Sequence, residues 1–122
     1  MAHAYDSNAA PPKAGPYSHA VRTGDVVFLS GQGPVDPATG AIPETFEEQV
    51  RQTLRNLAAA AAAAGGTLAD AVRVGVYLRE IETFAAMNEV YAEFFQEPYP
   101  ARTTIQTGIR IPVEIDAVLE VR

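Results

Sequence analysis

The chain has 122 residues, of which 48% are hydrophobic and 20% are charged, and its formal net charge at pH 7 is −6. This length fits one compact domain around a single hydrophobic core. The acidic balance, without a cluster of Lys and Arg, argues against a surface that binds a nucleic-acid backbone. The chain has no Cys, which excludes thiolate nucleophiles, disulfides and cysteine-liganded zinc or iron–sulfur sites.

The histidines and the hydropathy pattern exclude further classes of protein. His3 and His19 lack the spacing that places two metal ligands on one helix turn, so we expect no metal site. No apolar run approaches the roughly 18 residues of a membrane span, and the N-terminus lacks the pattern of a signal peptide. We therefore expect a cytoplasmic protein that does not contact a membrane.

The first part of the chain predicts a loose leader followed by a β-hairpin. Residues 1–14 mix Ala, Pro, Ser and Asn without periodicity, so we expect a loosely ordered leader before a single domain over residues 15–122. Two apolar segments, Tyr17–Arg22 and Val26–Ser30, flank a turn and predict paired strands. The segment Gly31–Gly40 holds three glycines and two prolines. It indicates either a loop shaped for a ligand or an ordinary connection.

Two helices are predicted after this loop. Thr45 and Glu48 have the spacing of a capping box, which indicates that the first helix begins there, and Gly65 ends it. Apolar residues at spacings of three and four predict the second helix, over about Phe84 to Gln96. Asn88 falls on or beside the apolar stripe of that helix.

Three further strands complete the predicted domain. Residues 71–78 alternate so that Val72, Val74, Val76 and Leu78 share one face. Residues 103–109 and 113–121 are the last two strands, and in the final one Glu114 and Asp116 point away from the apolar face. The order ββαβαββ predicts a two-layer α+β domain, a mixed sheet with both helices on one face. The other face is then free to meet another subunit.

Arg102 and Glu114 are the strongest candidates for chemistry. In one pocket, the arginine would bind a substrate carboxylate through two parallel hydrogen bonds and the glutamate would orient or activate water. That pair suits hydrolysis of a bond that is already reactive. Their spacing alone favours the other interpretation, a plain cross-strand salt bridge.

Three other polar residues have a functional and a structural interpretation. Tyr17 either closes a pocket or packs with its hydroxyl in water. Ser30 is presented to a loop-built site, but without a G-x-S-x-G motif or a base partner it is not expected to be a nucleophile. Asn88 either anchors a loop or belongs to a pocket.

Several segments together resemble the RidA/YjgF family of reactive imine deaminases. The match runs through most of the chain, and its ordered pieces are Gly15-Pro16-Tyr17-Ser18, Ser30–Pro37, Thr39-Gly40, Glu48-Gln49, Asn56-Leu57, Phe84–Tyr91, Pro100-Ala101-Arg102 and Val113–Ala117. The resemblance implies a chorismate-mutase-like fold and a homotrimer whose active sites lie between subunits. It also implies hydrolysis of 2-imino acids, such as 2-iminobutanoate and 2-iminopropanoate, to 2-keto acids and ammonia without a cofactor.

The resemblance also assigns roles to individual residues. Arg102 would bind the substrate carboxylate, and Glu114 would hold and activate the attacking water. The substrate site would also include Tyr17, Ser30, the backbone of Gly31, and Asn88. Thr104 stands where many members have Cys, which makes the pocket more polar. The link before Glu114 is shorter than is usual in the family.

Other functions remain alternatives at this point. The main one is a non-catalytic trimer that binds carboxylates or regulates another process. Relatives of the family have been described as translation-inhibiting ribonucleases, but the net charge of −6 argues against that activity here. A holdase-type chaperone is a further alternative, but nothing in the sequence predicts an exposed apolar patch.

Overall fold

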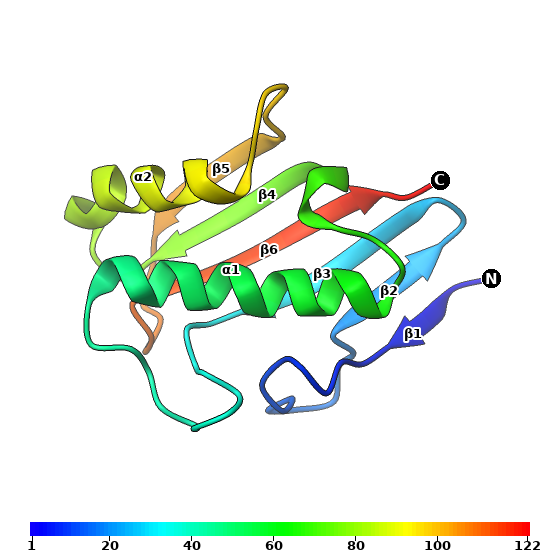
Figure 1. Cartoon of the computed structure of the whole chain (residues 1–122), viewed down its shortest axis with the longest axis horizontal. Coiled ribbons are helices and arrows are strands. Elements are labelled where there is room, and N and C mark those ends of the chain that lie inside the picture. Colours follow the sequence, from blue (N-terminus) through cyan, green and yellow to red (C-terminus); the bar gives the residue numbers. More distant parts are fainter.

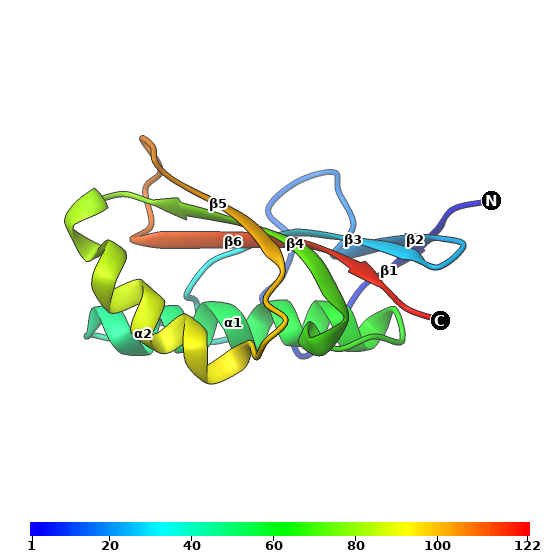
Figure 2. The same cartoon turned by 90° about the horizontal axis from the view of Figure 1, so that it is seen from above.

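The computed structural model describes all 122 residues as a six-stranded sheet with two helices packed on one face (Figures 1 and 2). Its strand order is β1-β2-β3-β6-β4-β5, and β4 and β5 are parallel while the other pairs are antiparallel. The elements are β1 (His3–Tyr5), β2 (Ala20–Thr23), β3 (Val26–Gln32), α1 (Phe46–Ala63), β4 (Ala71–Leu78), α2 (Phe84–Phe94), β5 (Ala101–Gln106) and β6 (Val113–Glu120). Short 3-10 helices at Leu68–Asp70 and Ile81–Thr83 precede β4 and α2.

The core lies between the sheet and the helices. Along β6, buried and partly exposed residues alternate, so that Val113, Ile115 and Leu119 face α1 while Glu114 and Asp116 face away. The facing stripe of α1 consists of fully buried residues, among them Val50, Leu54 and Leu57. The predicted two-layer α+β architecture is confirmed, and Figure 2 shows that the second face of the sheet carries no helix.

One residue of β4 departs from the predicted alternation. Val74, Val76 and Leu78 are fully buried as expected, but Val72 is 49% exposed. The pairing of β4 with β6 shifts register between Ala71 and Arg73, which leaves Val72 outside the ladder. The prediction of a shared face was therefore wrong for Val72.

The start of α1 forms half of the predicted capping box. The Glu48 backbone N–H donates to the Thr45 hydroxyl at 3.3 Å. The Glu48 carboxylate accepts a hydrogen bond from Arg51 at 2.6 Å instead of returning to the cap. Arg51 also binds Glu93 of α2 at 2.7 Å, so this side chain ties the two helices together.

The segment before residue 15 is more ordered than its composition indicates. His3–Tyr5 pairs with β2 as β1, and Ala10 is buried. The buried His19 ring accepts the Ser7 backbone N–H at its Nδ1, and its Nε2 lies 2.9 Å from the Pro11 carbonyl oxygen. The expectation of a loose leader was wrong in this respect, because these long-range contacts leave no trace in the local sequence pattern.

Candidate active site

Four of the predicted site residues meet on the open side of the sheet. Tyr17, Ser30, Gly31 and Glu114 line one open hollow of about 350 Å³. We call this group the acid half-site. Tyr17 comes from the segment before β2, Ser30 and Gly31 from the end of β3, and Glu114 from the start of β6.

The backbone of Gly31 makes room for the Glu114 carboxyl. A Cβ atom at position 31 would lie 2.5 Å from Oε2 of Glu114 and 2.9 Å from its Cδ. The pairing of β3 with β6 shifts register between Leu29 and Gln32, which brings Gly31 beside the carboxyl. Any larger residue at position 31 would therefore displace the Glu114 carboxyl from its place over β3.

Hydrogen bonds fix the strand end that carries Ser30. Its backbone N–H donates to the His19 carbonyl at 3.0 Å, and its hydroxyl donates to the Ser18 carbonyl at 2.6 Å. The buried Asn56 of α1 donates to the Gly33 carbonyl at 2.9 Å and to the Val35 carbonyl at 2.8 Å. The loop after β3 thus has one fixed shape, held from inside the core.

The surroundings of Glu114 shift its proton equilibrium toward the protonated form. Burial raises the pKa of this carboxyl above its ordinary value, and the negative charge of Asp116 raises the pKa further. A carboxyl with a raised pKa exchanges protons more readily near neutral pH than an ordinary glutamate does.

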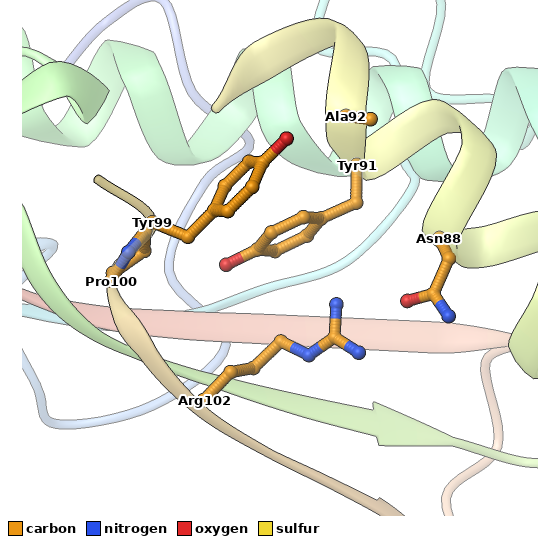
Figure 3. Close-up of a pocket in the computed structure, with 6 residues that line it drawn as sticks. All are labelled: Asn88, Tyr91, Ala92, Tyr99, Pro100 and Arg102. Atoms are coloured by element: carbon orange, nitrogen blue, oxygen red, sulfur yellow. The ribbon is translucent and has the colours of Figure 1, made fainter. Parts of the chain in front are cut away.

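The second group of site residues lies under α2. Asn88, Tyr91 and Ala92 of that helix, with Tyr99, Pro100 and Arg102, line a cavity of about 340 Å³ (Figure 3). We call this group, together with Thr104, the arginine half-site. The Arg102 guanidinium carbon lies 4.7 Å from the centroid of the Tyr91 ring and 5.6 Å from that of Phe84.

The arginine half-site contains polar atoms without partners inside the chain. Arg102 takes part in none of the five ion pairs of the structure. Asn88 Oδ1, the Tyr91 hydroxyl and Thr104 Oγ1 are buried and have no hydrogen-bond partner. Buried polar groups are normally paired, so this cluster has the character of a site for a polar ligand.

Tyr91 is a neutral hydroxyl in this cluster. Burial raises the pKa of Tyr91, and the positive charge of Arg102 opposes that rise. Figure 3 shows the Asn88 side chain directed toward the guanidinium and the Tyr91 ring lying over the Arg102 side chain. The combination offers a cation for a carboxylate and a hydroxyl that can donate to it.

Arg102 and Glu114 do not meet within one chain. Their strands are not neighbours, since β4 lies between β5 and β6. Arg102 pairs with Val74 of β4, and Glu114 pairs with Tyr77 three residues further along. With strand spacings of about 4.8 Å and a rise of about 3.3 Å per residue, their Cα atoms are roughly 14 Å apart. Their side chains also lie on opposite faces of the sheet.

The sequence expectations for this pair are therefore corrected. Arg102 and Glu114 form neither a cross-strand salt bridge nor a shared pocket within one chain. The seven predicted site residues divide into the acid half-site and the arginine half-site. The reason is topological, because β6 enters the sheet between β3 and β4 and leaves β5 at the edge.

Two aromatic residues of the arginine half-site were not predicted. Tyr91 was interpreted as part of the apolar stripe of its helix, and Tyr99 lies in the Pro-rich link after it. The available signal is spacing, since Tyr91 follows Asn88 by three positions and therefore shares its helical face. No group of three or more His, Asp or Glu side chains is arranged to hold a metal ion. No helix has both the length and the hydrophobicity to cross a membrane.

Comparisons with known proteins identify the family. The family described as Endoribonuclease L-PSP matches residues 7–121. A RutC family protein of Pyrococcus horikoshii is 45% identical over 114 residues, covering 89% of this chain and 90% of that protein. A protein of Escherichia coli named "putative reactive intermediate deaminase TdcF" is 38% identical over 118 residues, covering 94% of this chain and 91% of that protein.

Solved structures agree with this match over almost the whole length. The crystal structure of E. coli TdcF with bound serine superposes with a TM-score of 0.92 at 34% identity, covering 98% of this chain and 99% of that one. RidA from the Antarctic bacterium Psychrobacter sp. PAMC 21119 superposes with a TM-score of 0.93 at 38% identity, covering 98% of this chain and 99% of that one. The chain therefore belongs to the Endoribonuclease L-PSP family, the family of the RidA and YjgF proteins.

Proposed function

We propose that this protein is a cytoplasmic hydrolase that deaminates reactive 2-imino acids, with 2-iminobutanoate and 2-iminopropanoate as substrates. The observation that carries the proposal is the Arg102 guanidinium, free of ion pairs and surrounded by buried, unpartnered polar atoms. Such a group suits a small carboxylate. The name of the relative TdcF supports an imine as the reacting group, and the reaction would remove a damaging metabolite.

In the proposed reaction, Arg102 binds the substrate carboxylate and so presents the imine carbon to water. Glu114 accepts a proton from that water as its oxygen bonds to the imine carbon, and Glu114 then passes this proton to the imine nitrogen. The resulting carbinolamine then breaks its C–N bond. Glu114 takes the hydroxyl proton and passes it to the amino nitrogen, so that ammonia leaves as the C–O bond becomes the keto group, and no cofactor is required.

The remaining site residues have supporting roles in this proposal. Tyr17 would close the pocket from the side of the open sheet, and Gly31 would offer its backbone to the substrate or water. Ser30, whose hydroxyl already binds the Ser18 carbonyl, would act by fixing that backbone. Asn88 and Thr104 would orient the bound carboxylate beside Arg102. An imine is already electrophilic, so orientation and proton transfer are sufficient.

The reaction requires two copies of the chain for each site. A small imino acid cannot contact Arg102 and Glu114 at once when about 14 Å and the thickness of the sheet separate them. We propose a homotrimer in which the arginine half-site of one subunit faces the acid half-site of its neighbour. The uncovered face of the sheet is the surface available for such packing.

A carboxylate-binding protein without turnover is the second candidate. The solved structure of TdcF contains bound serine, which is a stable amino acid with the carboxylate that Arg102 would recognise. In this candidate the same pocket senses a metabolite. A ribonuclease activity is disfavoured, because the net charge of −6 does not suit a phosphate backbone.

Competition for the imine separates these functions. An amino-acid oxidase generates 2-iminopropanoate or 2-iminobutanoate, and semicarbazide traps what the protein has not hydrolysed. We expect the wild type and the surface control Arg55→Ala to suppress semicarbazone formation and Arg102→Ala to lose at least about 10²-fold in kcat/KM. Equal semicarbazone yields with wild type and buffer, across several imino acids, would reject the deaminase in favour of the binding protein.

A further inference from the structure

A polar cluster beside Glu114 has no role in the proposed reaction as described so far. Tyr77 donates its hydroxyl hydrogen to Oδ2 of Asp116 at 2.9 Å. Arg73 Nη1 lies 3.9 Å from Oδ1 of the same carboxylate. All three side chains lie on the uncovered face of the sheet, on β4 and on β6.

Gly75 provides the space in which the Asp116 carboxylate sits. Gly75 and Asp116 are register partners between β4 and β6. A Cβ atom at position 75 would overlap Oδ1 of Asp116 and would lie 2.9 Å from the Tyr77 hydroxyl oxygen. Any larger residue would therefore displace the carboxylate from this position.

This arrangement fixes a negative charge on the face of β6 from which Glu114 also extends. Asp116 follows Glu114 by two positions, so both side chains leave the same face of β6. Tyr77 is the register partner of Glu114, and its hydroxyl reaches along the sheet to Asp116. Burial is the larger reason why the pKa of Glu114 is raised, and the charge of Asp116 is the second.

The other groups around Glu114 do not supply a comparable charge. From β3 it meets the uncharged Ser30 and Gly31, and from the segment before β2 the cavity walls include Tyr17 and His19. The loop before β6 contributes the apolar Ile111. From β4, Tyr77 is directly opposite, and the cation Arg73 lies nearest to Asp116.

We propose that Asp116, seated over Gly75 and bound by Tyr77, is a positioning residue whose fixed negative charge acts on the Glu114 carboxyl. A neighbouring negative charge disfavours the ionised form of a carboxyl, and its effect depends on a fixed separation. The Tyr77 hydrogen bond supplies that fixed position. The inference rests on the proposed function for its catalytic meaning, while the coupling between the two carboxyls exists with or without turnover.

The test is a ¹³C NMR titration of the Glu114 side-chain carboxyl in the full-length protein. Asp116→Asn removes the charge but keeps an oxygen that can accept from Tyr77. We expect its Glu114 midpoint to move to lower pH than in the wild type. Gly75→Ala, which displaces the carboxylate, should also change the midpoint. Glu120→Gln, a control acid on the same face of β6 that binds Arg122, should leave it unchanged.

The pH profile of imine competition provides the second measurement. The part of the pH–activity profile that reflects the titration of Glu114 should move to lower pH in Asp116→Asn. The profile of the control Glu120→Gln should match that of the wild type. Equal Glu114 midpoints in the wild type and a folded Asp116→Asn would overturn the inference. If Asp116→Asn does not fold, Gly75→Ala and Tyr77→Phe decide by the same criterion. A shifted midpoint in a protein without turnover would instead refute the deaminase and leave the coupling standing.

Discussion

The Glu114 carboxyl lies over the backbone of Gly31, and a single added methyl group tests this arrangement. In Gly31→Ala the added Cβ would meet the carboxyl at 2.5 Å, so the Glu114 side chain must rotate away. We expect kcat for imine hydrolysis to fall by about 10-fold or more, because the base no longer faces the water. Gly108→Ala is the matched control, since a Cβ there meets nothing within 4 Å.

The same two variants show whether the loss of activity comes from displacing the Glu114 carboxyl or from a general change in the fold. The circular dichroism spectra and the oligomeric state of Gly31→Ala should match those of Gly108→Ala. Wild-type kcat in Gly31→Ala would show that the position of the Glu114 carboxyl over Gly31 is irrelevant to turnover.

The raised pKa of Glu114 also predicts a dependence of stability on pH. A carboxyl whose folded-state pKa exceeds its unfolded value contributes most stability below the unfolded pKa, and loses it as pH rises through the folded pKa. The free energy of unfolding of the wild type should therefore fall relative to that of Glu114→Gln as the pH rises above 4.5, the ordinary pKa of a glutamate carboxyl. Urea unfolding of both proteins at several pH values measures the difference. A constant difference would contradict the raised pKa.

At the scale of elements, α1 supports the acid half-site from the opposite side of the sheet. Asn56 is buried, and its amide donates to two carbonyls of the loop after β3. Asn56→Ala leaves both carbonyls without this donor, so we expect a loss of about 2 kcal/mol in the free energy of unfolding. The exposed Arg55→Ala on the same helix should change it by less than about 0.5 kcal/mol. Denaturant unfolding compares the two, and equal stabilities would contradict a stabilising role for the two Asn56 hydrogen bonds.

The elements themselves could be predicted because their signals are local. Alternation placed Val113, Ile115 and Leu119 on the buried face of β6, and the N-cap Thr45 marked the start of α1. β1 could not be predicted, since its three residues are a strand only because β2 lies beside them. The displacement of Val72 likewise arises from the register between two strands.

At the scale of the whole molecule, the candidate site residues could be named from the sequence, but their division into two groups could not. Arg102 and Glu114 are twelve positions apart in the chain, which suggests proximity when the intervening strand β4 is not known. Neither spacing nor alternation reveals that β6 lies between β3 and β4. Tyr91 and Asp116 were assigned to faces correctly, but their contacts with Arg102 and Tyr77 depend on that same topology.

In the proposed trimer, each site combines the arginine half-site of one subunit with the acid half-site of another. The most direct test is complementation between Arg102→Ala and Glu114→Gln, each inactive alone, after co-expression in equal amounts. Random mixing gives each site an intact half from both chains about a quarter of the time, so about a quarter of wild-type turnover should return.

The control replaces Glu114→Gln by the double variant Arg102→Ala/Glu114→Gln, which cannot supply an intact arginine half-site. Recovery in the first mixture but not in the control is the result expected from shared sites. Mixed oligomers that form and remain inactive, while the wild type hydrolyses imines, would contradict a site built from two subunits.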